Sequence, residues 1–253
     1  MSTFDLAKRC NTHLVVYPSD LLLKPPQSYL FIQDGLIIAC GVLYSLCYIF
    51  YITRSLRDRK LAGYIEYVSG NLAWELYYAF ATASTRFETL AFSAWFCLDV
   101  LFTALIISIS PTPGLVTIRV VLGFIVIYIA LWKLTIIFPD DRDQVTAYWT
   151  GILLQLPVGW GSLYFLLRDF DLRGHSLEIW IARYLGCLAA YGVFIWRYLN
   201  VPENWTYVGS FWSKMIMFWT LVPETIYPFM YMFVWVKTRP LSSLEKAKED
   251  KAE

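Results

Sequence analysis

The chain has 253 residues, of which 58% are apolar, 18% are aromatic and only 16% are charged. Because soluble domains carry about one quarter charged residues, this composition excludes an ordinary soluble domain and predicts a polytopic membrane protein. The net charge of +1 gives no indication of a nucleic-acid partner.

The N-terminal stretch does not have the organisation of a secretory signal. Residues 1–27 mix polar and apolar side chains and contain Pro18, Pro25 and Pro26, whereas a signal has a basic segment, an apolar core and a small-residue cleavage site. We expect residues 1–27 to form a lumenal cap that lies on the bundle, and the first apolar span to act as the insertion signal.

Seven apolar runs follow, each close to the roughly 20 residues that a membrane-spanning helix needs. They cover approximately residues 29–53, 63–83, 90–110, 115–138, 146–167, 177–198 and 211–236. The connections are short, and no internal repeat is visible. The predicted fold is all-α: a single seven-transmembrane-helix bundle over residues 28–238, followed by a charged, disordered cytosolic tail at residues 239–253.

The charges of the short loops predict the orientation of the bundle. Basic residues gather in the first loop, the fifth loop and the tail, among them Arg54, Arg57, Lys60, Arg168, Arg173 and Lys237. The N-terminus should therefore be lumenal and the C-terminus cytosolic, in a multi-pass protein of the endoplasmic reticulum. Asn204-Trp205-Thr206 would then be a lumenal glycosylation sequon.

The second apolar run contains a carboxyl group, Glu75. Asn71, Glu75 and Tyr78 share one face of a helix. An acid inside the membrane is costly and is a functional-site hypothesis by default; a structural hydrogen bond between helices is the alternative. Glu66 lies on the opposite side of this helix and is predicted to be an interfacial carboxylate near the basic first loop.

The last apolar run contains a second acid, Glu224, between Pro223 and Pro228. Proline in a spanning helix frees backbone carbonyls, which predicts a kink beside a pocket; a hydrogen-bonded kink without chemistry is the alternative. The face of Glu224 continues through residues with aromatic rings, namely Tyr227, Tyr231 and Trp235. At 1.5 Å per residue, Glu75 and Glu224 each lie about 18 Å from the cytosolic end of their helix, so we expect one common site.

Other polar residues in the spans carry weaker signals. Asp99 is a candidate third cavity residue or a partner in a hydrogen bond between helices, and Gln155 lines the cavity or packs between helices. Arg183 and Lys214 either balance an acid or extend to a membrane interface, and the second is expected for both.

No metal or cofactor is expected. His13 and His175 lie in different flanking regions and form no metal-binding pattern, and no phosphate-binding glycine loop is present. Asp140-Asp141-Arg142-Asp143 is similar to the magnesium-diphosphate sites of prenyl transferases. Such sites are normally paired and this one stands alone, so it is predicted to be a solvated loop.

The chain resembles the small seven-span terpene cyclases of fungal meroterpenoid and indole-diterpene pathways. The resemblance rests on Asn71-Leu72-Ala73-Trp74-Glu75, on an acid three residues before Tyr227-Pro228, and on size and span count. In that family the two acids implicated in cyclisation would correspond to Glu75 and Glu224; the second is most often aspartate. The resemblance implies metal-independent cyclisation of a polyprenyl chain, initiated by protonation of an epoxide or alkene on a prenylated small molecule.

The residue types suit this chemistry. A carboxyl group in an apolar site stays protonated and can act as a general acid, and rings such as Tyr78, Tyr227, Tyr231 and Trp235 can stabilise a carbocation. The sequence does not separate the proton donor from its helper. Besides substrate, the expected partner is the lipid bilayer, with no obligate protein partner. The alternatives are a lipid- or sterol-binding or receptor-like protein without turnover, and a proton-coupled transporter.

Overall fold

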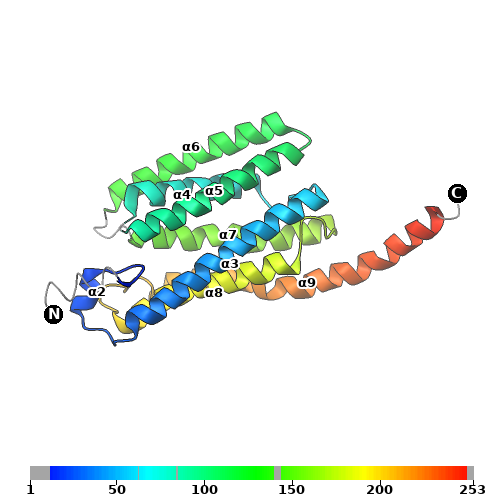
Figure 1. The fold of residues 1–253 in the computed structure, drawn as a ribbon. Helices are drawn as coiled ribbons and strands as arrows, with labels where there is room; N and C mark the ends of the chain where they lie inside the picture. Colours follow the sequence, from blue (N-terminus) through cyan, green and yellow to red (C-terminus); the bar gives the residue numbers. More distant parts are fainter. Residues whose placement is uncertain (1–11, 62, 84, 140–143, 250–253) are drawn as a thin grey trace.

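The structure, a computed structural model, describes residues 12–61, 63–83, 85–139 and 144–249. Within these residues every regular element is a helix (Figure 1). The elements are α2 (Pro18–Leu22), α3 (Tyr29–Asp58), α4 (Ile65–Tyr77), the π-helical η1 (Tyr78–Thr82), α5 (Arg86–Ile109), α6 (Pro113–Ile137), α7 (Gln144–Asp169), α8 (Leu177–Asn200) and α9 (Phe211–Glu249).

The predicted all-α membrane architecture is confirmed. Five helices, α3, α5, α6, α7 and α8, are long and apolar enough to cross a membrane. The second predicted run forms α4, of 13 residues, continued by η1, and the seventh lies within α9, of 39 residues. All seven runs coincide with helices, whereas the exact number of membrane crossings stays a prediction.

Local signals set where several helices begin. At the start of α5, Thr85 accepts a hydrogen bond from the backbone N–H of Glu88, and the Glu88 carboxylate accepts one from the backbone N–H of Thr85. Pro113 occupies the first turn of α6, where its missing N–H is not needed. Ser176 caps α8 by accepting from the backbone N–H of Ile179. These caps place α5 and α8, which contribute residues to the site described below.

The helices pack as neighbours along the bundle: α3 against α8, α4 against α6, and α7 against α9 (Figure 1). Large apolar side chains cover the outer surface, and on α6 they include Ile118, Leu122, Ile125, Ile129 and Ile136. Exposed apolar surface of this extent fits contact with lipid rather than water.

The segment before α3 packs against one end of the bundle. Val15, Tyr17 and Leu21 are buried in a cluster with Trp205. The buried carboxylate of Asp20 accepts hydrogen bonds from Tyr29 Oη at 2.9 Å, Trp205 Nε1 at 3.1 Å and Asn204 Nδ2 at 2.7 Å. The nitrogen of the predicted glycosylation sequon is thus already engaged. The lumenal location of this end stays a prediction.

Pro223 and Pro228 lie inside the part of α9 that packs in the bundle, and neither interrupts the helix. Pro223 and Pro228 each remove the amide hydrogen that the carbonyl four residues earlier would accept. Indole N–H groups of neighbouring helices replace the missing amide donors. Trp160 Nε1 donates to the carbonyl of Trp219 at 3.0 Å, and Trp180 Nε1 donates to the carbonyl of Glu224 at 2.7 Å. The freed carbonyls are therefore satisfied inside the bundle.

The end of the chain differs from the prediction. The tail after Pro240 was expected to be disordered, but α9 continues to Glu249 and projects beyond the other helices (Figure 1). The strong helix formers Leu244-Glu245-Lys246-Ala247-Lys248-Glu249 explain the continuation.

Candidate active site

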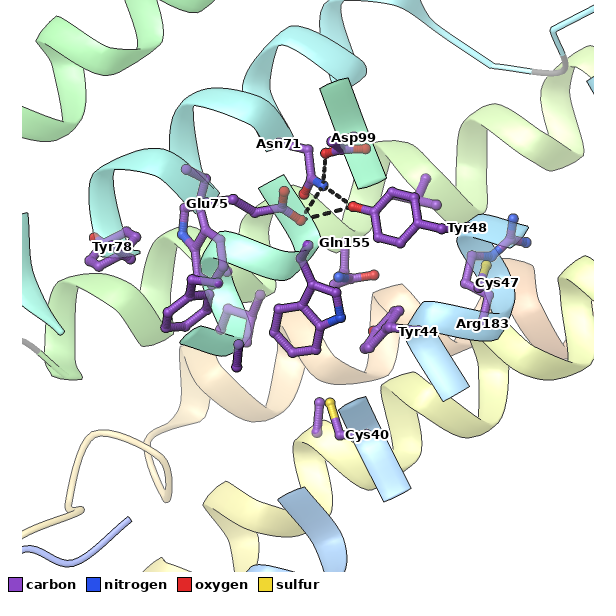
Figure 2. Close-up of a pocket in the computed structure, with 18 of the residues that line it drawn as sticks. Cys40, Tyr44, Cys47, Tyr48, Asn71, Glu75, Tyr78, Asp99, Gln155 and Arg183 are labelled. Atoms are coloured by element: carbon purple, nitrogen blue, oxygen red, sulfur yellow. Dashed lines mark hydrogen bonds between the residues drawn. The ribbon is translucent and has the colours of Figure 1, made fainter. Parts of the chain in front are cut away.

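A cavity of about 310 Å³ lies between α3, α4, α5, α7 and α8 (Figure 2). Its wall is mainly apolar and rich in rings, which include Tyr44, Tyr48, Tyr51, Tyr67, Trp74, Tyr78, Phe87, Phe92, Trp95, Phe102, Tyr148 and Phe194. A volume of this size accommodates a small-molecule ligand.

Four polar side chains from three helices meet at the cavity wall (Figure 2). Asn71 Nδ2 lies within hydrogen-bonding distance of Tyr48 Oη (2.5 Å), Asp99 Oδ2 (2.5 Å) and Glu75 Oε1 (3.0 Å). Tyr48 Oη in turn donates to Glu75 Oε1 at 2.8 Å. We call Tyr48, Asn71, Glu75 and Asp99 the acid cluster. Tyr48 was not identified from the sequence.

The two carboxyl oxygens of Glu75 differ in their hydrogen bonds to the described residues. Glu75 is only 4% exposed, its Oε1 accepts two hydrogen bonds, and its buried Oε2 makes none with the described residues. An unsatisfied buried polar atom is costly and calls for an explanation in a native structure. Because Glu75 lines the cavity, a bound substrate can supply the missing partner.

Tyr78 and Gln155, both predicted to line a pocket, do line this cavity (Figure 2). Tyr78 Oη lies 3.3 Å from Thr150 Oγ1, which also accepts a hydrogen bond from Trp74 Nε1 at 2.8 Å. The π-helical turn η1 begins at Tyr78, one turn after Glu75. Such turns are frequent at functional sites.

Glu224 lies outside the acid cluster, in a buried ion pair with Arg183. Arg183 Nε contacts Glu224 Oε1 at 2.7 Å, and Nη2 contacts Oε2 at 2.9 Å. Arg183 Nη1 also donates to Tyr51 Oη at 2.6 Å and Ser162 Oγ at 2.9 Å. The prediction that Arg183 extends to an interface is therefore wrong: α8 and α9 bring it against an acid inside the bundle.

The two acids, expected to share one site, have no hydrogen-bond partner in common among the described residues. Arg183 lines the cavity, but Glu224 stands behind it and does not. Close packing of α7 holds the pair in place, since a Cβ at Gly159 would lie 2.9 Å from Pro223 Cγ and 3.1 Å from Glu224 Oε1. Glycine at this position lets α7 approach the acid-bearing turn of α9.

The three aromatic residues predicted on the face of Glu224 also lie away from the cavity lining. Tyr227 packs with Leu166 and Val234, and its hydroxyl lies 3.0 Å from His175 Nδ1. Tyr231 packs against the same cluster, and Trp235 is half-buried one turn further along α9. Rings of α3, α4 and α5 line the cavity instead.

Comparison of the sequence with known proteins identifies a family. The family of Pyr4-like transmembrane terpene cyclases matches residues 19–237. The chain belongs to this family. Relatives include the Pyr4-family terpene cyclase mfmH of Annulohypoxylon moriforme, 29% identical over 87% of this chain and 94% of that protein. They also include the terpene cyclase macJ of Penicillium terrestre (26% identical, 87% and 89%) and the asnovolin H synthase nvfL of Aspergillus novofumigatus (23%, 88% and 93%). No solved structure matches the chain.

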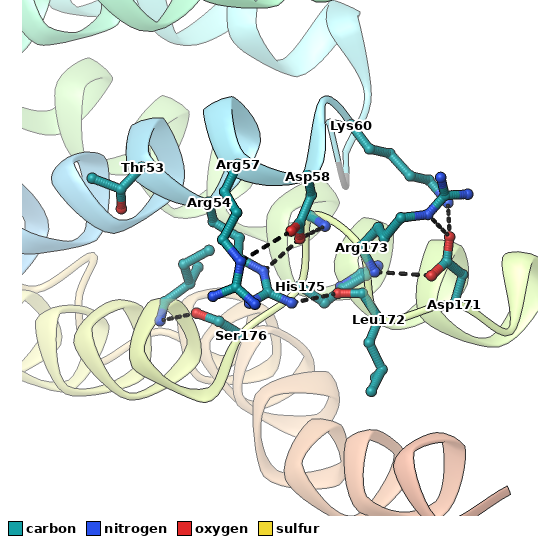
Figure 3. Close-up of polar contacts among 12 residues, drawn as sticks. Thr53, Arg54, Arg57, Asp58, Lys60, Asp171, Leu172, Arg173, His175 and Ser176 are labelled. Atoms are coloured by element: carbon teal, nitrogen blue, oxygen red, sulfur yellow. Dashed lines mark hydrogen bonds and ion pairs between the residues drawn. The ribbon is translucent and has the colours of Figure 1, made fainter. Parts of the chain in front are cut away.

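At one end of this terpene cyclase, basic residues are paired with acids at the end of α7 and in the following loop. Lys60 Nζ lies 2.9 Å from Oδ2 of Asp169, the last residue of α7. It also lies 3.2 Å from Asp171 Oδ2 in the following loop, and Arg173 Nε lies 2.7 Å from that same oxygen (Figure 3). Glu66, predicted to meet the first loop, pairs instead with Arg119 of α6, and both side chains are exposed. The neighbouring position of α4 and α6 explains this different partner.

The described part of the terpene cyclase contains no group of three or more histidine, cysteine, aspartate or glutamate residues placed to hold a metal ion. Asp140, Asp141 and Asp143, predicted to form a solvated loop, lie outside the described residues.

Proposed function

We propose that this membrane terpene cyclase protonates the terminal epoxide, or the terminal alkene, of a polyprenyl chain on a meroterpenoid or indole-diterpene precursor, and closes rings inside the cavity. The supporting observation is the unpartnered, buried Oε2 of Glu75 at the wall of an apolar, ring-lined cavity. Terpene cyclisation needs a positioned acid in a place from which water is excluded.

The hydrogen bonds of the acid cluster favour Glu75 as the donor. Tyr48 and Asn71 both donate toward Oε1, which leaves Oε2 to carry the carboxyl hydrogen. When that proton passes to an epoxide oxygen, the C–O bond breaks as π electrons of the chain form the first new C–C bond. The remaining carboxylate keeps its two donors, which stabilise the charge that develops on it.

Asp99 supplies a second carboxyl group to the acid cluster through Asn71. Two adjacent negative charges in an apolar site are unfavourable, so the pair readily holds one proton between its members. Asp99 accepts a hydrogen bond from the Asn71 amide and lies close enough to the Glu75 carboxyl to accept its hydrogen. We therefore assign Asp99 and Asn71 to keeping Glu75 oriented and protonated.

The cavity wall suits a carbocation. The Trp74 ring lies 5.0 Å from the Tyr78 ring and 5.3 Å from the Phe92 ring, all within the cavity lining near Glu75. The negative faces of such rings attract a cation. The final cation loses a proton to a base, so the product has the mass of the substrate and no cofactor is consumed.

Glu224 receives a supporting role in this proposal. Both of its oxygens are engaged by Arg183, and neither reaches the cavity lining. We assign to Glu224 the positioning of Arg183 at the wall, next to Tyr51 and Ser162. The proposal therefore gives Glu75 and Glu224 different roles, which the sequence alone did not distinguish.

The proposal is tested with microsomes that contain the protein and an epoxidised prenyl-phenol substrate, with and without EDTA. We expect a cyclic product of unchanged mass in both conditions. Binding of the substrate without any product would favour a lipid- or sterol-binding protein. Loss of product in EDTA, restored by magnesium, would contradict the metal-independent mechanism.

The orientation is part of the same proposal, with the N-terminus lumenal and the C-terminus cytosolic in the endoplasmic reticulum. Protease added to intact microsomes should digest a tag placed after Glu253 and spare one placed before Ser2. The reverse pattern would overturn the orientation.

A further inference from the structure

A second buried cation, Arg197, reaches the cavity far from the acid cluster. It lies in the last turn of α8, is 3% exposed and lines the cavity. Within the described part of the chain its one hydrogen bond runs from Nε to Gln33 Oε1, at 2.8 Å. Gln33 is neutral, so this bond brings no counter-charge.

Aromatic rings surround the guanidinium of Arg197. Its central carbon lies 4.6 Å from the centroid of the Trp205 ring, 5.2 Å from that of Tyr17 and 5.7 Å from that of Phe194. The rings and the carbonyls at the C-terminal end of α8 favour a cation here. Ring faces are not hydrogen-bond acceptors of the usual kind, and no oxygen of the described residues accepts from Nη1 or Nη2.

The acids nearby have other partners. Asp20 accepts hydrogen bonds from the Tyr29 hydroxyl and the Trp205 indole, and the Glu88 carboxylate accepts from the Tyr17 hydroxyl and the backbone of Thr85. The ion pairs found among the described residues do not include Arg197. Asp20 binds the same Trp205 indole that Arg197 packs on, but no carboxylate of the described residues accepts a hydrogen bond from the Arg197 guanidinium, so Nη1 and Nη2 remain for an anion that enters the cavity.

Arg183, on the same helix, is a buried arginine whose three guanidinium nitrogens all have hydrogen-bond acceptors in the protein. It precedes Arg197 by 14 positions, or about 21 Å along α8 at 1.5 Å per residue, and both face the cavity. All three nitrogens of Arg183 donate, two of them to a carboxylate. The corresponding donors of Arg197 are left for a molecule that enters the cavity.

We propose that Arg197 binds an anionic oxygen of the substrate head group, from a carboxylate or an acidic phenol or enol. The cavity then has a cation at one end and the acid cluster at the other. On α3, Gln33 beside Arg197 precedes Tyr48 of the acid cluster by 15 positions, or about 22 Å. The apolar wall between them, which includes Ile37 and Tyr44, receives the prenyl chain. The placement of the prenyl chain along this wall rests on the proposed cyclase function, whereas the binding of an anion by Arg197 does not.

The binding step is tested without catalysis, on the full-length protein purified in detergent. Salicylate should raise the melting temperature of the wild type, and methyl salicylate should not. Arg197→Gln should lose the shift, and Lys214→Gln, which removes an exposed cation, should retain it. An equal shift with both compounds, no shift with salicylate, or a full salicylate shift in Arg197→Gln would overturn the inference.

The catalytic consequence is tested with two epoxidised prenyl-phenols that differ in one group, a free carboxyl or its methyl ester. Arg197→Gln should raise KM for the acid by about tenfold to a hundredfold, the usual weight of a hydrogen bond between charged groups, and raise KM for the ester much less. Values of kcat should change little for either. An equal rise in KM for both substrates would mean that Arg197 is structural.

Arg197→Lys is the second variant, in case Arg197→Gln does not fold. Lysine keeps the positive charge but lacks the planar pair of N–H donors that arginine offers to an anion. The variant should lower the preference for the acid over the ester without abolishing it; an unchanged preference would overturn the inference. If neither prenyl-phenol is cyclised while the salicylate shift still depends on Arg197, the cyclase proposal fails and the anion site stands. If both are cyclised and Arg197→Gln treats them equally, the anion site fails and the cyclase stands.

Discussion

Glu75 and Glu224 are both buried membrane acids, 4% and 3% exposed, yet their surroundings differ in one decisive respect. Both oxygens of Glu224 face a guanidinium. Among the described residues, Glu75 has neutral donors on Oε1 and none on Oε2. Burial alone therefore does not identify a proton donor; the partners of the carboxyl group do.

The two surroundings have different physical consequences. Removal of one member of a buried ion pair leaves an uncompensated charge, so the Arg183–Glu224 region should control stability. Neutral donors allow an acid to hold a proton and then stabilise the carboxylate that remains after transfer, so the Glu75 region should control rate.

The largest expected effect is on the rate of Glu75→Gln. Glutamine keeps the size and the hydrogen bonds of Glu75 but has no transferable proton, so kcat should fall by about 10²–10⁴-fold, the usual contribution of a general acid. The melting temperature should change little. Turnover of the epoxide by purified variant is the measurement, and Glu66→Gln, which alters an exposed acid, is the control expected to behave as wild type. Wild-type turnover in Glu75→Gln would remove the basis of the proposed mechanism.

The next effect is on stability, at the ion pair. Arg183→Leu or Glu224→Leu alone should lower the free energy of unfolding by about 3–5 kcal/mol, since each leaves a buried charge without a partner. The double variant should be more stable than either single variant. Denaturant titration in detergent completes this double-mutant cycle. Additive losses would show that the pair contributes no coupling.

A third prediction concerns pH and the neighbourhood of Tyr227. Burial, reinforced by Arg183 and Lys60, lowers the pKa of His175 to about 4. Because the unfolded chain then binds more protons between pH 4 and 6.5, this contribution to stability is complete above pH 6.5 and is lost as the pH falls toward 4, by about 3 kcal/mol. His175→Gln should flatten the melting temperature in that interval relative to wild type. Parallel pH profiles would contradict this assignment.

The smallest effect expected within the acid cluster is that of Tyr48→Phe. It removes one of the two donors to Glu75 Oε1 and leaves Asn71 in place. One hydrogen bond to a charged group corresponds to about a tenfold loss of kcat. Tyr64→Phe removes the hydroxyl of another cavity-lining tyrosine and should be near neutral. Equal losses in the two variants would mean that the Tyr48 hydroxyl has no special relation to Glu75.

The sequence predicted those features that lie within one helix. Periodicity identified the face of Asn71, Glu75 and Tyr78, and hydropathy located where each of the seven long helices begins, though not where α9 ends. Asp99 and Gln155 were noted because polar side chains are rare in such spans, with cavity lining or contacts between helices as the alternatives, and both residues line the cavity.

Features that depend on the register between helices were not predictable. Tyr48 is one of 18 tyrosines, and no local pattern distinguishes the one that meets Glu75 across α3 and α4. Arg183 and Glu224 were each noted, but only the packing of α8 against α9 shows that they pair. Arg197 was not singled out from the sequence, because the rings and the cavity around it come from distant segments.

The most direct test of the division between the two acids is the single-turnover rate of Glu75→Gln and Glu224→Gln, each measured per mole of protein in the folded fraction recovered by size exclusion. Folded Glu224→Gln should retain at least about a tenth of the wild-type rate, whereas folded Glu75→Gln should retain less than about a hundredth. If folded Glu224→Gln were as slow as Glu75→Gln, proton transfer would involve both acids and the division would be wrong.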